Sequence, residues 1–270
     1  MAASLDAPDA PEVPAGAACR AAFVVLAGGS GSRVGAPVNK VYLPLAGRSV
    51  LAWSFAWARQ VALVTRFVLV VRADDLATAR DVVAREVVGL DVDVVVGGAT
   101  RHASEVAALD HLAPAVERGE LDVIAVHDGA RPLADPDLVR RVVATAAAVG
   151  GAVPAVPAEG LLPVDSAGEP ARPPDTGAGL PDASARLPED AGERLRLARV
   201  QTPQAFRAAD LLAAYRAAAR DGFQGTDTAS CLEAYSPVEV RVVPGSRHNL
   251  KVTFPHDLLL AAELLAARLA

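Results

Sequence analysis

Residues 22–33 are Ala22-Phe-Val-Val-Leu-Ala27-Gly28-Gly29-Ser30-Gly31-Ser32-Arg33, an apolar run that ends in closely spaced glycines. The run predicts a buried strand over 22–27 that leads into a loop. Glycines have no Cβ, so their backbone N–H groups can approach phosphate oxygens closely. Glycine pairs also occur at strand ends simply to turn the chain. The residues that follow the pair are needed to distinguish a phosphate-binding loop from an ordinary turn.

The spacing of the glycines excludes two common nucleotide-binding loops. A dinucleotide fingerprint needs a third glycine where this chain has Val34. A Walker loop ends in Gly-Lys-Ser/Thr, whereas Lys40 lies between Asn39 and Val41. What remains is a phosphate-sized loop flanked by Arg33 and Lys40. Two cations beside such a loop suit a triphosphate whose pyrophosphate is leaving.

Strands are expected to alternate with helices along most of the chain. We predict strands at 67–71, 92–96, 123–126, 152–156, 198–200 and 238–243, and helices at 49–60, 74–87, 102–112, 135–149, 207–220, 227–234 and 255–270. This alternation favours an α/β fold, a Rossmann-like three-layer sandwich whose mostly parallel sheet has helices on both faces. Ligands of such sheets bind beyond the carboxyl ends of the strands. The polar segments Gly28–Lys40, Gly97–Ser104 and His127–Arg131 follow strand ends, so we expect them to form one site.

Two polar residues are expected to begin helices. Asp135 precedes Pro136, the combination of an N-cap with proline at the first helical position. Ser49 is the expected N-cap of the helix at 49–60.

The chain divides into a tail and one domain. Its 270 residues are 52% apolar, enough for one substantial core. Residues 1–20, rich in Pro and Ala, are expected to form a disordered tail and do not resemble a secretory signal. One domain is expected over 21–270, and its triphosphate-sized loop predicts a nucleotidyltransferase domain. Its Pro- and Gly-rich insertion at about 159–193 is expected to be a projecting arm or a disordered loop.

Composition excludes two classes of partner. The formal net charge of −6 gives no support for nucleic-acid binding. No uninterrupted apolar run approaches the ~20 residues of a membrane span. Cys19 and Cys231 match no metal or redox spacing, so free thiols in a cytoplasmic protein are expected.

Five motifs follow one another along the chain. The first joins the glycine turn and Arg33 to Asn39-Lys40-Val-Tyr-Leu-Pro-Leu. The others are Gly97-Gly98-Ala-Thr-Arg101-His-Ala-Ser104, His127-Asp128-Gly-Ala-Arg131-Pro132, Gln201-Thr202-Pro203-Gln204-Ala-Phe206 and Asn249-Leu-Lys251-Val-Thr, with Thr226-Asp227-Thr-Ala-Ser just before the last. In this order they resemble the 2-C-methyl-D-erythritol 4-phosphate cytidylyltransferases, over roughly residues 22–270 apart from the insertion.

The resemblance implies an enzyme of the isoprenoid precursor pathway. A phosphate oxygen of the acceptor attacks the α-phosphorus of CTP, pyrophosphate leaves, and a CDP-alcohol forms with Mg²⁺ assisting through ligands that the sequence does not identify. It also implies a homodimer joined through the arm. Because the nucleophilic phosphate is already ionised at neutral pH, no strong general base is required. His127 is therefore expected to support the strand end through a hydrogen bond.

The resemblance also implies roles for individual residues. Arg33 and Lys40 are the expected catalytic residues, which stabilise the transition state on the triphosphate. The expected CTP-binding residues are Ala27, Gly28, Gly29, Gly31, Gly98, Arg101, Ser104 and Asp128. The expected acceptor-binding residues are Asp128, Arg131, Arg194, Thr226 and Lys251. A simpler alternative remains for Arg194, which with Arg196 and Arg199 could form a solvated basic strip.

The chain departs from the family pattern on the acceptor side. Gly160 and Leu161 stand where the family typically has an Asp-Thr pair, and neither side chain can donate a hydrogen bond to the acceptor phosphate. Ala99 replaces an acidic residue common in the cytosine loop. Two alternatives therefore stay open. One is a cytidylyltransferase for another acceptor, such as ribitol 5-phosphate or a phosphonate, and the other is a non-catalytic nucleotide-binding regulator.

Overall fold

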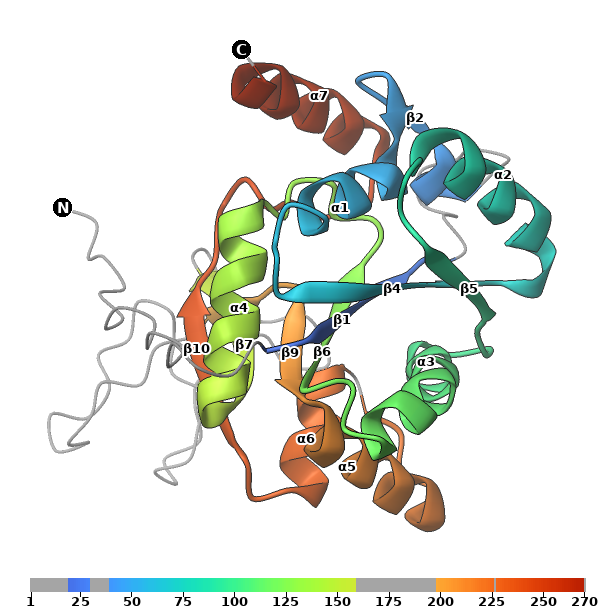
Figure 1. Cartoon of the computed structure of the whole chain (residues 1–270). Coiled ribbons are helices and arrows are strands. Elements are labelled where there is room, and N and C mark those ends of the chain that lie inside the picture. Colours follow the sequence, from blue (N-terminus) through green and yellow to red (C-terminus); the bar gives the residue numbers. More distant parts are fainter. Residues whose placement is uncertain (1–18, 30–38, 159–197, 226, 270) are drawn as a thin grey trace, which may run out of the picture.

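The computed structural model describes residues 19–29, 39–158, 198–225 and 227–269. Within them, an eight-stranded mixed sheet lies between two layers of helices (Figure 1). The strands of this sheet are β1 (Ala21–Leu26), β4 (Val64–Val71), β5 (Val92–Val96), β6 (Val123–Asp128), β7 (Gly150–Pro157), β8 (Ala198–Val200), β9 (Gln204–Arg207) and β10 (Glu239–Pro244). The helices are α1 (Val50–Ala58), α2 (Leu76–Glu86), α3 (Arg101–Glu117), α4 (Pro136–Val149), α5 (Ala208–Asp221), α6 (Thr228–Tyr235) and α7 (Pro255–Leu269). The expected three-layer α/β architecture is confirmed.

The strand order brings the polar segments to one edge of the sheet. The path runs β10-β7-β9-β6-β1-β4-β5, with β8 paired to β7. Strand β1 lies parallel to β4 and β6, and β4 lies parallel to β5. Parallel neighbours end at the same edge, so the residues after β1, β4, β5 and β6 converge there.

The alternation of side chains along β1 builds the two cores. Phe23 and Val25 pack in the cluster shared with α1, α2 and α4. Ala22 and Val24 point to the opposite face and pack in the cluster shared with α3, α5 and α6. Strand β1 thus buries both of its faces, as a central strand of a sheet covered on both sides requires.

A third cluster supports the segment that follows β6. Helix α7 packs beside the small hairpin of β2 (Pro44–Leu45) and β3 (Arg48–Ser49), with Trp53, Trp57 and Leu265 in the cluster. The Trp57 indole Nε1 donates to the Pro132 carbonyl at 2.8 Å. This bond fixes the backbone directly after Arg131.

The structure corrects several element boundaries. No strand was predicted over residues 204–207, but they form β9, antiparallel to both β6 and β7, and α5 begins at Ala208. The hairpin β2–β3 was also missed. Helix α2 begins at Leu76 after a 3₁₀ turn over Ala73–Asp75, and α3 continues past the expected end at 112 to Glu117 with Pro114 inside it. These elements are short or contain a residue that usually ends a helix, so local patterns did not reveal them.

The two expected N-caps have different outcomes. The Asp135 carboxylate accepts a hydrogen bond from the Leu138 N–H at 2.8 Å, which confirms the first. Ser49 precedes α1, but its side chain makes no capping bond. Its backbone N–H instead donates to the Glu86 carboxylate at 2.6 Å. Ser49 is therefore at the expected N-cap position, but the prediction that its hydroxyl caps the helix was wrong.

Two predicted segments, the tail and the insertion, fall on residues that the structure does not describe. Residues 1–18, which make up nearly all of the expected tail, and the insertion at 159–193 lie outside the described residues. Cys19 and Cys231 are free, buried thiols, as expected. Among the described helices, none is both long and apolar enough to cross a membrane.

Candidate active site

A cavity of about 720 Å³ lies at the carboxyl edge of β1, β4, β5 and β6. The predicted site residues that line it are Gly28, Gly29, Lys40, Gly98, Arg101, Ser104, Asp128 and Lys251. The expectation that the polar segments after several strands meet in one place is confirmed.

Six other predicted residues do not appear in this lining. Gly31, Arg33, Arg194 and Thr226 lie outside the described residues, as do Gly160 and Leu161. Ala27 is buried behind the wall, where its carbonyl accepts a hydrogen bond from the Asn39 amide at 2.8 Å. Arg131 is also behind the wall and reaches the site through Asp128.

The loop after β5 is packed tightly against the first turn of α3. A Cβ at Gly98 would overlap the Ala103 methyl, and one at Gly97 would lie 2.7 Å from the Ser104 hydroxyl. That hydroxyl donates to the Thr100 carbonyl at 2.9 Å, and the Thr100 side chain caps α3 by accepting from the Ala103 N–H at 3.0 Å. Because glycine leaves this backbone uncovered, the loop presents peptide groups to the cavity.

Lys40 is anchored beside the glycine turn. It is 8% exposed and begins a 3₁₀ turn over Lys40–Tyr42, which Asn39 precedes. The Asn39 amide donates to the Ala27 carbonyl at 2.8 Å and to an Asp75 carboxylate oxygen at 3.1 Å. These bonds join the end of β1 to the start of α2, so Lys40, which lines the cavity, is carried by a fixed backbone.

Asp128 is surrounded by three cations. Its carboxylate pairs with the Arg101 Nη1 in a short contact, lies 2.9 Å from the Lys251 Nζ, and lies 3.6 Å from the Arg131 Nε. Its side chain is 10% exposed. Burial opposes ionisation, but Arg101, Lys251 and Arg131 hold the pKa of Asp128 well below its usual range. Asp128 is therefore an anion that organises the cations at this end of the cavity.

His127 is a neutral support behind Asp128. Its Nε2 lies 3.0 Å from the Arg131 carbonyl, which only accepts, so this nitrogen carries the hydrogen. Its Nδ1 lies 3.2 Å from the Thr202 hydroxyl oxygen, which in turn accepts the Asp128 N–H at 2.9 Å. Burial lowers the pKa of His127 to about 4. The expected supporting role through a hydrogen bond is confirmed.

The last two motifs hold Lys251 in place. The Arg131 guanidinium donates to the Asn249 carbonyl, and the Val252 N–H donates to the Ala130 carbonyl, both at 2.8 Å. The Asn249 amide donates to the Thr202 carbonyl at 2.9 Å. The segment that carries Lys251 is thus fastened to the residues that follow β6, although the two are far apart in the sequence.

Sequence reasoning missed two side chains that matter here. Arg72 lines the cavity directly after β4. The rule that ligands bind beyond strand ends could have identified it. Glu105 is a buried acid one turn after Arg101 on α3. Glu105 could have been noticed because it is a charged residue on the same helix face as the buried Leu109 and Leu112.

The family comparison agrees with this geometry. The family model for 2-C-methyl-D-erythritol 4-phosphate cytidylyltransferase matches residues 21–169 and 182–267. A curated protein of that name from Cereibacter sphaeroides is 39% identical over 246 residues, which cover 91% of this chain and 96% of the relative. One from Thermobifida fusca is 35% identical over 256 residues, covering 93% and 95%.

Solved structures share the fold. The crystal structure of 2-C-methyl-D-erythritol 4-phosphate cytidylyltransferase from Thermus thermophilus superposes with a TM-score of 0.64 at 28% identity, covering 91% of this chain and 98% of that one. The 4-diphosphocytidyl-2C-methyl-D-erythritol synthase structure from Anaerococcus prevotii has a TM-score of 0.72 at 22% identity, covering 93% and 100%, and supports the fold alone. The chain belongs to the 2-C-methyl-D-erythritol 4-phosphate cytidylyltransferase family.

Proposed function

We propose that this protein transfers the cytidylyl group of CTP to 2-C-methyl-D-erythritol 4-phosphate. A phosphate oxygen of the acceptor bonds to the α-phosphorus of CTP, the bond from that phosphorus to the β-phosphate oxygen breaks, and pyrophosphate leaves. The observation that carries the proposal is a single cavity, in a chain of this family, whose lining includes Lys40 together with Asp128 and two of its paired cations, Arg101 and Lys251.

The nucleotide would bind at the ends of β1 and β5. Gly28, Gly29 and Gly98 leave backbone donors and acceptors open to the cavity, and such groups can select cytosine by its edge without a charged side chain. Ser104 and Arg101 complete this side, and Gly31 is a further proposed contact, whereas Ala27 supports the turn from behind the wall. Lys40 and Arg33 would bind the triphosphate.

The acceptor would bind at the ends of β6 and of the segment that carries Lys251. The Lys251 ammonium can bind the acceptor phosphate, while Asp128 can accept a hydrogen bond from an acceptor hydroxyl. Arg131 would act from behind Asp128, and Arg194 and Thr226 are the remaining proposed contacts.

The chemistry requires positioning and charge more than proton transfer. The acceptor phosphate is ionised at neutral pH and needs no strong base. Negative charge develops on the departing pyrophosphate, where Lys40 and Arg33 would stabilise it. His127 takes no proton in this account, because its accepting nitrogen, Nδ1, faces the Thr202 hydroxyl and the ring is buried outside the cavity lining.

The site fits a divalent cation that takes most of its ligands from the substrate phosphates. Among the described residues, no group of three or more His, Cys, Asp or Glu side chains could hold a metal by itself. Asp128 is the carboxylate that the described lining offers. Mg²⁺ commonly binds through one or two carboxylates together with substrate phosphates, so this donor set suits it. When bound, Mg²⁺ would neutralise phosphoryl oxygens.

We also infer a cytoplasmic homodimer joined through the 159–193 arm, on the strength of the family resemblance and the two free thiols. Light scattering tests the assembly. A mass of two chains is expected. A mass of one chain, unchanged at high protein concentration, would contradict the dimer.

A pyrophosphate-release assay with CTP tests the function. The acceptors are 2-C-methyl-D-erythritol 4-phosphate, ribitol 5-phosphate, and a small phosphonate. We expect turnover with the first alone. Turnover with a different acceptor would favour another cytidylyltransferase, and CTP binding without any turnover would favour a regulator.

A further inference from the structure

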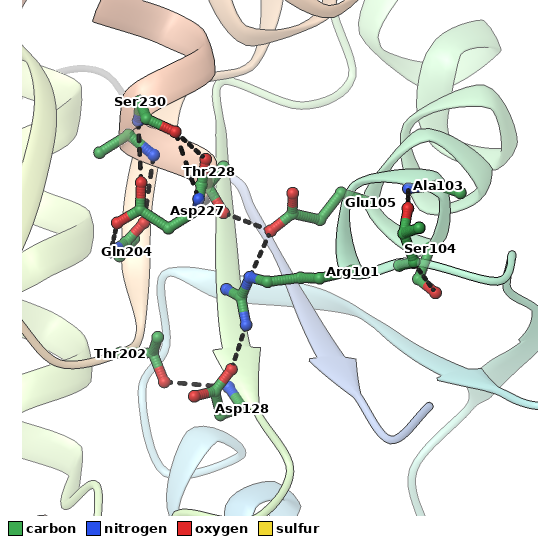
Figure 2. Close-up of polar contacts among 12 residues, drawn as sticks. Arg101, Ala103, Ser104, Glu105, Asp128, Thr202, Gln204, Asp227, Thr228 and Ser230 are labelled. Carbon is green, nitrogen blue, oxygen red and sulfur yellow. Dashed lines mark hydrogen bonds and ion pairs between the residues drawn. The ribbon is translucent and has the colours of Figure 1, made fainter. Parts of the chain in front are cut away.

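Glu105 lies behind the cavity wall and contacts one of the cavity's cations. Its side chain is 1% exposed, and its Oε1 lies 3.1 Å from the Arg101 Nε, one turn earlier on α3. Figure 2 shows the Arg101 side chain extending from α3 with Glu105 on one side and Asp128 on the other. Glu105 itself is absent from the described lining of the cavity.

Two hydroxyl groups fix the Glu105 carboxylate from other helices. The Thr228 hydroxyl on α6 donates to Oε1 at 2.7 Å, and the Tyr215 hydroxyl on α5 donates to Oε2 at 2.6 Å. Burial, followed by the neighbouring Glu105, raises the pKa of the Tyr215 phenol far above its ordinary value, so this hydroxyl keeps its proton and donates. The carboxylate is thus anchored between three helices.

The Arg101 guanidinium is held between two acids. It pairs with Asp128 through Nη1 and with Glu105 through Nε. Although burial opposes it, Asp128 and Glu105 raise the pKa of Arg101. The contact at Nε is an ion pair without a hydrogen bond, so Glu105 acts on the guanidinium through its charge. A cation that is attracted to one carboxylate can still move about that contact, whereas a second carboxylate on its other side restrains its position from two directions. Glu105 supplies the second contact.

The balance of charge around Asp128 gives Glu105 a second effect on Arg101. Three cations, Arg101, Arg131 and Lys251, face the single Asp128 carboxylate. Without another anion, Arg101 would compete with Lys251 for Asp128 in a buried setting where unbalanced charge is costly. Glu105 balances Arg101 and leaves Asp128 available to Lys251.

We propose that Glu105 is a positioning residue for the cytidylyl transfer, which acts by orienting Arg101 against Asp128. This inference rests on the proposed function, because Arg101 belongs to the proposed CTP side and Asp128 to both sides. Through Thr228, Glu105 also ties Arg101 to the first residue of α6, two positions after the proposed acceptor residue Thr226. One carboxylate thereby connects the two substrate sides.

A double-mutant cycle tests the proposal. Glu105→Gln keeps the size of the side chain but removes its charge, and we expect kcat/KM to fall about 10- to 100-fold, as loss of substrate positioning does. In an Arg101→Met background, where nothing remains to be oriented, the same change should lower kcat/KM less than about twofold. A purely structural role would instead give the same fold-change in both backgrounds, and that result would overturn the proposal.

Glu117→Gln is the matched control. It is the same substitution on the same helix, at an exposed glutamate that pairs with Arg216 of α5. Its kcat/KM should equal that of the wild type. A Glu105→Gln enzyme as active as this control would also overturn the proposal.

A second variant and a binding measurement cover the cases in which Glu105→Gln does not fold or the wild type transfers CTP to no acceptor. If Glu105→Gln does not fold, Thr228→Val replaces it in the cycle, because it removes the hydroxyl that fixes Oε1 while keeping the carboxylate. The Kd for CTP, measured by calorimetry, is followed through the same cycle. If the wild type binds CTP but transfers it to no acceptor, the proposed function fails, and the coupling of Glu105 to Arg101 in CTP binding still decides the inference.

Discussion

The Lys251 ammonium lies 2.9 Å from the Asp128 carboxylate, which joins the loop before α7 to the end of β6. Arg131, three residues after Asp128, donates to the Asn249 carbonyl in the same loop at 2.8 Å. The acceptor end of the cavity is therefore assembled around one buried anion, and its properties should depend on that anion.

Replacing Asp128 with Asn should destabilise the fold and slow transfer. The variant leaves Arg101, Arg131 and Lys251 without their shared counter-ion, and breaking a buried ion pair costs on the order of 3 kcal/mol in the free energy of unfolding. Urea denaturation at neutral pH measures this. Asp137→Asn is the control, since it removes an exposed pair with Arg140 and should cost under about 1 kcal/mol. Equal effects of the two substitutions would contradict the central role of Asp128.

Asp128 should also make stability depend on acidity. Its pKa is held well below the usual range in the folded protein, so the unfolded chain binds the proton first as pH falls. The stabilisation is complete above an ordinary carboxyl pKa of about 4 and is lost as pH decreases below it. Asp128→Asn should reduce the slope of unfolding free energy against pH in this acid range. An unchanged slope would contradict the assignment.

His127 should contribute a separate dependence at higher pH. Burial lowers its pKa from 6.5 to about 4, so the unfolded state binds more protons between these values. The stabilisation is therefore complete above pH 6.5 and is lost as pH falls toward 4, by roughly 3 kcal/mol. His127→Gln, whose amide can donate to the Arg131 carbonyl, should flatten the unfolding free energy over that window. His256→Gln, at a site with a 75% exposed side chain, should leave it unchanged.

Removing the Lys40 ammonium should abolish turnover while leaving the fold intact. A preorganised donor to developing charge is commonly worth about 10²–10³ in kcat, and Lys40→Ala should lose at least that much. Circular dichroism and Tm report the fold, and Arg140→Ala on the surface of α4 is the control for lost positive charge. Activity near that of the wild type in Lys40→Ala would refute the site assignment.

The tight loop after β5 should be sensitive to a single methyl group. Gly98→Ala would place its Cβ against the Ala103 methyl and displace the loop from the cavity. We expect KM for CTP to rise about tenfold. The second change Ala103→Gly removes that methyl group and should restore part of the affinity. A KM that stays near the wild-type value in Gly98→Ala would show that this loop does not contact the nucleotide.

The sequence was sufficient to predict the parallel part of the sheet and the place of the site. Parallel strands end at one edge whatever side chains they carry, so the alternation of strands and helices was enough to bring Gly28, Gly98 and Asp128 together. The contacts of Glu105 with Tyr215 and Thr228 could not be predicted. Such hydrogen bonds depend on how α3, α5 and α6 pack, and helix periodicity describes one helix at a time.

Strand β9 was missed for a related reason. Its four residues are stabilised by pairing with β6 and β7, neither of which is adjacent in sequence. A four-residue segment that directly precedes a helix is too short to show a periodicity that distinguishes it from the first turn of that helix. Arg72, in contrast, could have been predicted. It directly follows β4, so the rule that ligands bind beyond the carboxyl ends of parallel strands applies to it as it does to Asp128.

Phosphorus NMR of the wild-type enzyme with CTP, Mg²⁺ and 2-C-methyl-D-erythritol 4-phosphate tests the central claim most directly. The account predicts that the triphosphate and acceptor signals are replaced by the two coupled resonances of a CDP-alcohol, with free pyrophosphate appearing in equal amount. Unchanged spectra with this acceptor, under conditions in which CTP binds, would contradict it.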